Sequence, residues 1–241
     1  MKTEIKEKMI SEMVTEDFRK AGVFRKYGID FCCGGNKTLQ EVAAKKKLDL
    51  AAIEADLSAI ENSAGQKEND ASDWKVDYLC EHIVNIHHNY VRNTNPNLIA
   101  WSEKVALRHG DHLPYLLEVR DLVKEVVNEL DAHMMKEEHV LFPYITNLAL
   151  MARKGEKPVA PFGSVANPIK MMENEHVQVG EMIQKIQDVT NNYTPPLEAC
   201  NTFRILFQTL KAYEEDLFLH IHLENNILFP KAIKLETEGK E

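Results

Sequence analysis

The sequence lacks the features expected of membrane, nucleic-acid-binding and disulfide-rich proteins. Its 241 residues carry 29 basic and 38 acidic side chains, a formal net charge of −9. Broad basic patches for nucleic acid or an anionic membrane are therefore not expected. No apolar run is long enough to span a bilayer, and the first ten residues contain no apolar secretory core. We expect a cytoplasmic protein without nucleic-acid or membrane partners.

Cysteine and strand patterns are also scarce. The four cysteines are Cys32, Cys33, Cys80 and Cys200. None of them forms a C-x-x-C pair, which excludes a zinc ribbon or a thioredoxin-like motif. Helical periodicity dominates, and apolar residues make up 44% of the chain, enough for a sizeable core. The expected fold class is all-α, in one or two domains.

The helical patterns divide the chain into three parts. Residues 1–62 are expected to form a small helical domain with a Cys-Cys turn. Residues 63–74 are polar and predict a linker. Residues 75–237 carry four long helical patterns joined by short loops, which predict an up-down four-helix bundle. Pro96 is expected to kink or interrupt the first of these helices.

Three residues of the small domain are expected to begin helices as N-caps. Thr38 is followed three residues later by Glu41, the spacing of a capping box. Thr15 and Asp49 are residue types that also favour the N-cap position. The sequence therefore predicts helices that start near positions 15, 38 and 49.

A repeated motif is the most informative feature of the chain. His133-x-x-x-Glu137-x-x-x-Leu-Phe-Pro recurs 87 residues later as His220-x-x-x-Glu224-x-x-x-Leu-Phe-Pro. A spacing of four places an imidazole and a carboxylate one turn apart on one helical face. One such pair can arise by chance, but two copies closed by the same tripeptide indicate two halves of one metal site. Imidazole with carboxylate suits iron or manganese better than copper or structural zinc.

The histidines of the four long patterns lie at matched depth. His88, His133, His176 and His220 are separated by 45, 43 and 44 residues, which places all four at one level of an up-down bundle. His133 and His220, with the carboxylates that follow them, fall on apolar stripes. An ionised carboxylate on such a stripe is costly unless it is paired or binds a metal. The pattern predicts one buried metal site.

The first long helix leaves its ligand open. The apolar stripe from Val76 through Ile83 to Tyr90 centres near His87. His88 lies about 100° further round a helix of 3.6 residues per turn. Periodicity alone therefore favours His87.

The remaining polar residues are expected to have ordinary roles. A single histidine, or a single His-x-x-x-Glu pair, is more often a surface feature of a helix than a ligand. For Glu173 and Glu175, which flank His176, a surface role is favoured over a hydrogen bond to a ligand. We expect a solvated or supporting role for the other histidines, which are His82, His109, His112, His139 and His222.

Several segments resemble one known family. Residues 133–138, 174–176 and 223–230 resemble a hemerythrin-like di-iron domain. Residues 24–35, Phe-Arg-Lys-Tyr-Gly-Ile-Asp-Phe-Cys-Cys-Gly-Gly, resemble the short N-terminal domain of the RIC proteins (repair of iron centres, also called the ScdA or YtfE type). Residues 193–200 are similar as well. The resemblance covers nearly the whole chain, and the combination of both domains is more specific than either alone.

The resemblance implies two non-haem iron ions with an oxo or hydroxo bridge. Glu137 and Glu224 would bridge the irons as well, and the resemblance, not the spacing, selects His88 over His87. It implies repair of iron–sulfur clusters damaged by nitric oxide or oxidants, so damaged iron–sulfur proteins are the expected partners, and a homodimer is left open. The implied ligands are His88, His133, Glu137, His176, His220 and Glu224.

Three functions are consistent with such a site, and we favour the first. In the first, the protein donates iron to damaged clusters, with Cys32 and Cys33 as transient thiolate ligands or a docking point. The alternative for these cysteines is a pair of small buried residues in a tight turn. The second function is a di-iron nitric oxide reductase, and the third is a sensor that binds oxygen or nitric oxide. Whether the chain is an enzyme with turnover is therefore left open.

Overall fold

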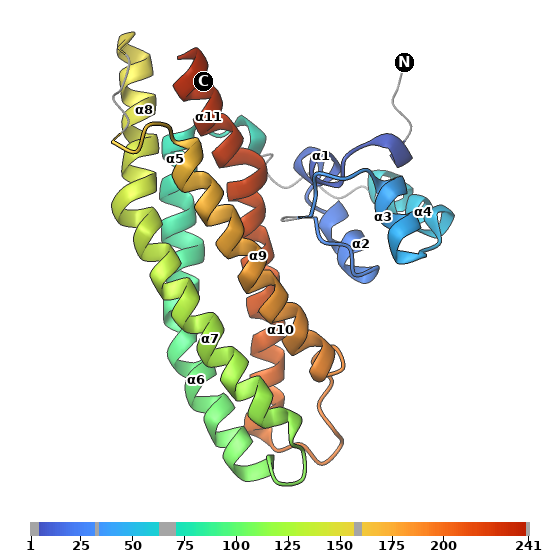
Figure 1. Cartoon of the computed structure of the whole chain (residues 1–241). Helices are drawn as coiled ribbons and strands as arrows, with labels where there is room; N and C mark the ends of the chain where they lie inside the picture. Colours follow the sequence, from blue (N-terminus) through green and yellow to red (C-terminus); the bar gives the residue numbers. More distant parts are fainter. Residues whose placement is uncertain (1–4, 32–33, 63–70, 157–160, 240–241) are drawn as a thin grey trace.

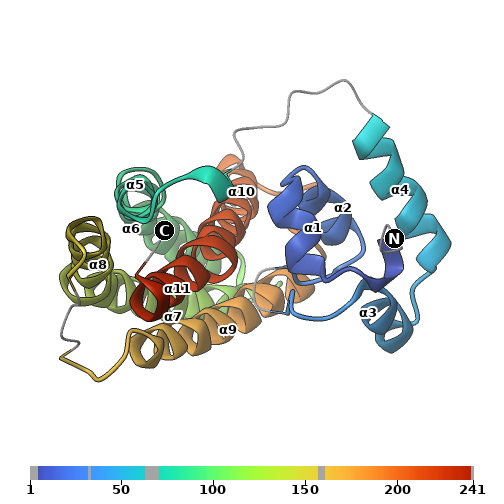
Figure 2. The same cartoon turned by 90° about the horizontal axis from the view of Figure 1, so that it is seen from above.

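Two groups of helices lie side by side in the protein (Figures 1 and 2). The computed structural model describes residues 5–31, 34–62, 71–156 and 161–239. Within these ranges there is no β-strand, only an isolated bridge between Met9 and Thr38, and the all-α fold class is confirmed. No helix of the described residues combines the length and apolarity needed to cross a bilayer.

The N-terminal group consists of short helices around a small core. A 3-10 turn, η1 (Ile5–Glu7), precedes them. Phe24, Leu39 and Ile53 are fully buried where the helices meet, because each helix can bury only one apolar face. The four helices are α1 (Ile10–Glu16), α2 (Lys20–Lys26), α3 (Leu39–Lys46) and α4 (Leu50–Asn62).

Side chains cap two of these helices as expected. The Thr38 hydroxyl accepts from the Glu41 N–H (3.3 Å), and the Glu41 carboxylate accepts from the Thr38 N–H (2.9 Å), so the predicted capping box is confirmed. Asp49 accepts a hydrogen bond from the first turn of α4 (3.2 Å). The prediction for Thr15 is wrong, since Thr15 lies inside α1 and its hydroxyl donates to the Ser11 carbonyl (2.9 Å). A threonine can make that bond without ending a helix.

The second group is a four-helix bundle of up-down topology (Figure 1). A 3-10 turn, η2 (Ala71–Asp73), leads into it. Each rod of the bundle runs antiparallel to the next, as the short connections require. The rods are α5 (Val76–His82), η3 (Ile83–His88) and α6 (Asn89–His109); α7 (Tyr115–Lys136), η4 (Glu137–Leu141) and α8 (Phe142–Lys154); α9 (Ala166–Val189); and α10 (Asn201–Leu223), η5 (Glu224–Leu228) and α11 (Phe229–Glu238).

Three of the four rods pass through a π-helical turn at the level of the predicted ligands. These turns are η3, η4 and η5. A π turn holds an extra residue, so two consecutive residues can face the core. The expectation for the first rod assumed 3.6 residues per turn, which does not hold in a π turn. For this reason periodicity favoured His87 over His88. At these three turns, neighbouring buried residues include His87 and His88, Leu141 and Phe142, and Leu228 and Phe229.

Pro96 does not interrupt the first rod, because α6 continues through that residue, and the kink expected as the alternative stays a prediction. The preceding residue, Asn95, is buried and ties α6 to two other rods. Its amide nitrogen donates to Asp131 on α7 (3.0 Å), and its carbonyl oxygen accepts from the Tyr213 hydroxyl on α10 (2.7 Å). These bonds and the surrounding packing outweigh the single backbone hydrogen bond that a proline removes.

The N-terminal helices lie against the last rod of the bundle (Figure 2). The ring of Phe31 packs on Phe218 (6.1 Å between centroids) and on His222 (6.3 Å), and Phe18 packs on His222 (5.5 Å). The side-chain amide of Asn226 donates to the Phe31 carbonyl (3.4 Å). The chain at residue 31 therefore lies beside the second copy of the repeated motif.

Glu236 on α11 holds the start of α9. Its carboxylate accepts from the Val165 N–H (3.0 Å), the Ser164 hydroxyl (2.7 Å) and the Tyr144 hydroxyl (2.9 Å). An anion at a helix N-terminus satisfies free N–H groups and faces the positive end of the helix dipole. Burial, reinforced by this carboxylate, raises the pKa of Tyr144 to about 12.

We expect Glu236→Ala to lower the free energy of unfolding by about 1–3 kcal/mol, because three donors lose their acceptor. Urea denaturation followed by circular dichroism measures the change. Glu238→Ala, two residues further along and exposed, is the matched control and should stay within about 0.5 kcal/mol. Equal effects of the two substitutions would contradict the role assigned to Glu236.

Candidate metal centre

Six buried side chains from all four rods meet in the bundle. Their ligand atoms form two groups, each within 4.8 Å, and both groups contain Glu137 and Glu224. We call the group with His88 and His220 the first position and the group with His133 and His176 the second position. None of the six is more than 2% exposed. The side chains thus outline two adjacent places for a cation that share two carboxylates.

Each shared carboxylate faces both positions, with one oxygen toward each. Glu137 Oε2 lies 3.3 Å from a histidine Nε2 of the first position, and Oε1 lies 3.3 Å from one of the second. Glu224 repeats this arrangement at 3.0 Å and 3.1 Å. A carboxylate placed in this way is suited to bridge two ions.

The distances and the unsatisfied atoms both fit a pair of metal ions. The two Nε2 atoms face each other at 3.2 Å in the first position and 3.0 Å in the second. Two nitrogens bound at about 2.1 Å and at a right angle to one ion are about 3.0 Å apart. Within the described chain, both oxygens of Glu137 and Oε2 of Glu224 are buried without a hydrogen-bond partner. Such oxygens are costly unless a cation compensates them.

Without metal, protons compensate the buried charges. Burial alone would lower the pKa of His133, but the carboxylates of Glu137 and Glu175 outweigh it and raise the pKa to about 10. Burial also disfavours the charged forms of Glu137 and Glu224, yet the neighbouring imidazoles keep the pKa of each below its ordinary value. A cation would displace these protons, so its affinity should fall as the pH falls.

The repeated motif also supplies the outer hydrogen bonds of two histidines. In each copy, the residue directly after the shared carboxylate reaches a histidine of another rod. Glu138 Oε1 lies 2.6 Å from His88 Nδ1, and Asn225 Oδ1 lies 2.8 Å from His176 Nδ1. Such bonds orient an imidazole ligand and strengthen it. Both positions therefore depend on residues that the motif repeats.

In each copy of the motif, the phenylalanine of Leu-Phe-Pro packs on the histidine whose outer nitrogen that copy also bonds. Phe142 is stacked on His88 (5.8 Å between centroids, 17° between planes), and Phe229 is stacked on His176 (6.2 Å, 6°). Both phenylalanines follow directly after a π turn, which brings them into the core. The closing tripeptide of the motif thus helps to hold the rings of the centre.

Glu175 supports a third histidine. Its carboxylate lies 2.9 Å from His133 Nδ1 and accepts from Lys136 Nζ (2.5 Å). The hydrogen bond to His133 is the main cause that lowers the pKa of Glu175 to about 2. The surface role favoured for Glu175 is therefore wrong. Glu138 has a similar partner, because it accepts from Arg92 (2.6 Å).

The structure brings together all six residues that the resemblance implies as ligands, and their binding of metal stays a prediction. His87 is buried beside the cluster but belongs to neither position. His222 is only 2% exposed, and burial lowers its pKa to about 4. Cys32 and Cys33 lie outside the described residues.

Sequence reasoning missed the supporting roles of Glu138 and Asn225. Both stand directly after the carboxylate of the repeated motif. Their equivalent positions in the two copies of the motif could have indicated a common role. The equivalence is not evident from residue type, because one is an acid and the other an amide, although both accept a hydrogen bond through oxygen.

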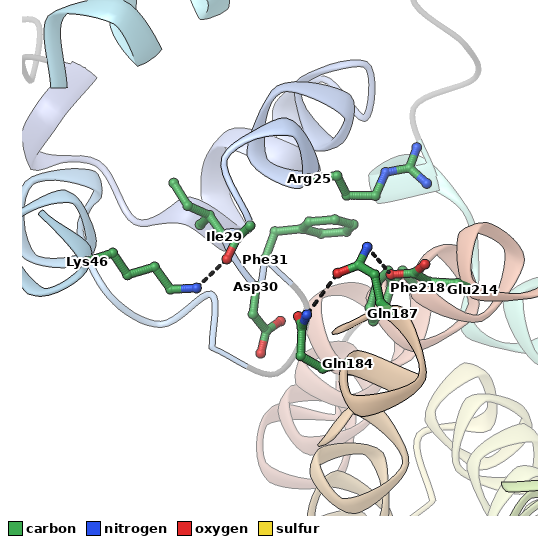
Figure 3. A pocket seen from close by; sticks show the side chains of 10 residues that line it. Arg25, Ile29, Asp30, Phe31, Lys46, Gln184, Gln187, Glu214 and Phe218 are labelled. Atoms are coloured by element: carbon green, nitrogen blue, oxygen red, sulfur yellow. Dashed lines mark hydrogen bonds between the residues drawn. The ribbon is translucent and has the colours of Figure 1, made fainter. Parts of the chain in front are cut away.

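A separate pocket lies between the N-terminal helices and the bundle (Figure 3). Its polar groups from the bundle are paired: Gln184 donates to Gln187 (2.8 Å), which donates to Glu214 (3.3 Å). None of the six clustered residues lines it, so we assign it no part in metal binding. The side chains drawn as lining it include Arg25, Ile29, Asp30, Phe31, Lys46 and Phe218.

Comparison with known families defines the class of the bundle. Residues 81–232, which include all six clustered side chains, match the hemerythrin HHE cation binding domain. Residues 6–61 match ScdA_N, described as a domain of unknown function. The bundle is therefore a hemerythrin-type cation-binding domain that follows an ScdA-type domain.

Whole-length relatives narrow the assignment. The chain is 36% identical over 235 residues to the iron–sulfur cluster repair protein YtfE of Musicola paradisiaca, covering 96% of this chain and 99% of the relative. It is 38% identical over 228 residues to the YtfE protein of Citrobacter koseri and 36% identical over 227 residues to the probable iron–sulfur cluster repair protein of Haemophilus influenzae, each covering 93% of this chain and 96% of the relative. The chain belongs to the family of YtfE-type iron–sulfur cluster repair proteins.

Metal should stabilise the protein, and Glu137→Leu should abolish that effect. A ligand at 100 times its Kd stabilises a folded protein by about 2.7 kcal/mol. We expect anaerobic ferrous iron to raise the melting temperature of the metal-free wild type but not of the variant. The metal-free variant should be less stable than the metal-free wild type, because the imidazoles of His88 and His133 lose the buried carboxylate that faces them.

Differential scanning calorimetry with and without iron measures both effects. Glu173→Leu, at an exposed site outside the cluster, is the control that should keep the metal-induced rise. A normal rise in Glu137→Leu would show that this carboxylate is not a ligand.

Proposed function

We propose that the protein repairs iron–sulfur clusters damaged by nitric oxide or oxidants by donating iron to them. The observation that carries this proposal is the pair of buried cation positions that share two carboxylates. The family relation supports it, because the relatives that match over almost the whole chain are named iron–sulfur cluster repair proteins. A stress-response role follows from such an activity.

Two non-haem iron ions, with an oxo or hydroxo third bridge, are the proposed occupants. Imidazole nitrogen and carboxylate oxygen are donors that iron accepts well. Bound there, iron would supply a redox-active centre. The residues of the chain hold the ions in place, with Glu137 and Glu224 as the shared ligands and Glu138, Glu175 and Asn225 orienting three of the imidazoles.

Each position offers four protein donors, two imidazoles and two carboxylate oxygens. Iron in an octahedral site takes more ligands than this, so places for exchangeable ligands would remain. An iron donor needs such places, because a ligand from the acceptor can bind the iron there before the protein releases it. The same feature supports a second candidate function, the reduction of nitric oxide, which the experiment below separates from repair.

The division into residues 1–62, 63–74 and 75–237 is part of the proposal. The first part would present Cys32 and Cys33 to a damaged iron–sulfur protein in the cytoplasm, and the third would hold the iron. The contacts of Phe31 with Phe218 and His222 support these separate roles. Phe31 directly precedes the cysteines in the sequence, and its ring lies beside the second copy of the motif.

Iron transfer is the direct test. With a reductant present to supply one electron, protein loaded with ferrous iron-57 should restore a hydro-lyase whose four-iron cluster has lost one iron to an oxidant, and Mössbauer spectroscopy should find iron-57 in the restored cluster. Glu224→Leu should transfer less than about a tenth as much, since even the loss of a supporting residue costs metal sites about tenfold or more. Glu173→Leu should behave as wild type.

Two outcomes would contradict this proposal. Restoration without iron-57 in the client would exclude donation. Sustained nitrous oxide formation with an electron donor, without repair, would favour the reductase.

The cysteine pair can be tested separately. The double variant Cys32→Ser/Cys33→Ser should bind the normal amount of iron but repair clusters more slowly, because a serine hydroxyl is a poor substitute for a thiolate ligand. Cys200→Ser, at the N-cap of α10, is the matched control. Repair at the normal rate by the double variant would eliminate the thiol role.

A further inference from the structure

The two metal positions have similar contacts, except that the residue corresponding to Glu175 of the second position is His87 in the first. In the second position, His133 bonds the carboxylate of Glu175, the residue that precedes the other histidine of that position. The corresponding place in the first position is occupied by His87. Its ring does not bond His220 but lies parallel to it, 5.6 Å between centroids and 9° between planes.

His220 therefore lacks the support that the other three histidines have. Their Nδ1 atoms bond Glu138, Glu175 and Asn225. His220 Nδ1 is buried and has no hydrogen-bond partner in the parts of the chain that the structure describes. A partner at the outer nitrogen fixes a ligand ring and makes it a stronger donor, and its loss typically weakens metal binding about 10–100-fold.

His87 is fixed in place for its contact with His220. Its Nδ1 lies 3.0 Å from Asp216 Oδ1, one turn before His220 on α10. His87 is 2% exposed, and its Nε2 is buried with no hydrogen-bond partner among the described residues. An unsatisfied buried nitrogen is costly, and a phenylalanine would pack on His220 without that cost. A stacked ring restrains the plane of its neighbour but accepts no hydrogen bond from it.

We propose that the ion of the first position, between His88 and His220, is the one that the protein gives up, and that His87, held by Asp216, is the positioning residue that sets how firmly it is bound. This inference rests on the proposed iron donation and specifies which ion leaves. The second position, with both outer nitrogens bonded, keeps its ion during transfer.

Stepwise metal binding tests the inference without any repair assay. Anaerobic calorimetric titration of the metal-free protein with ferrous iron should show two steps whose Kd values differ by about tenfold or more. His87→Ala should weaken the weaker step and leave the tighter step unchanged. His87→Phe, which restores a flat ring against His220, should recover most of the loss.

A gain-of-affinity variant makes the test sharper. His87→Glu together with Asp216→Asn places a carboxylate at the site that corresponds to Glu175 and removes the neighbouring charge. The weaker step should tighten until the two steps approach each other. Asn225→Ala is the matched control, because it removes the partner of His176 and should weaken the tighter step.

The outcomes separate the inference from the proposed function. Equal affinities in the wild type, or a loss in both steps with His87→Ala, would overturn the inference even if iron-57 transfer occurs. Two distinct steps that respond as expected, without any transfer, would reject repair and leave the unequal positions established. Circular dichroism of each metal-free variant shows that it is folded, and if His87→Ala is not, the double variant and Asn225→Ala decide.

Discussion

The structure depends on the compensation of two carboxylates buried in the middle of an apolar bundle. Glu137 and Glu224 are fully buried, and a carboxylate in such surroundings is stable only beside positive charge. Four imidazoles face them, and each carboxylate divides its oxygens between two histidine pairs. The level of these residues in all four rods, and hence the register of the rods, follows from this requirement.

The π turns are the backbone's contribution to the same centre. The turns η3, η4 and η5 each hold an extra residue at the level of the centre, and each has two buried neighbours within it or at its end. In η4 and η5 this brings a leucine and the phenylalanine that packs on a histidine into the core. In η3 it brings in both His87 and His88. Much of the difference between the two positions therefore originates in one turn of the first rod.

The sequence predicted the fold class and the meeting of His133, Glu137, His176, His220 and Glu224, because spacing of four and matched depth are properties of straight rods. The sixth side chain, His88, was selected over His87 by the family resemblance alone. The sequence did not predict the π turns, and therefore it did not predict that both His87 and His88 are buried. Contacts between rods were also hidden. Glu175 looked like a surface residue because its partner, His133, lies 42 residues earlier in the chain.

A protein that releases iron from a buried site must replace the charge that leaves. Burial alone would lower the pKa of His88, but the Glu137 carboxylate outweighs it and raises the pKa above its ordinary value, so this imidazole takes up a proton more readily once the first position is empty. Protons can therefore compensate Glu137 and Glu224 as an ion departs, and the bundle does not have to unfold. Unequal positions ease this exchange further, because one ion can leave while the other still compensates both shared carboxylates.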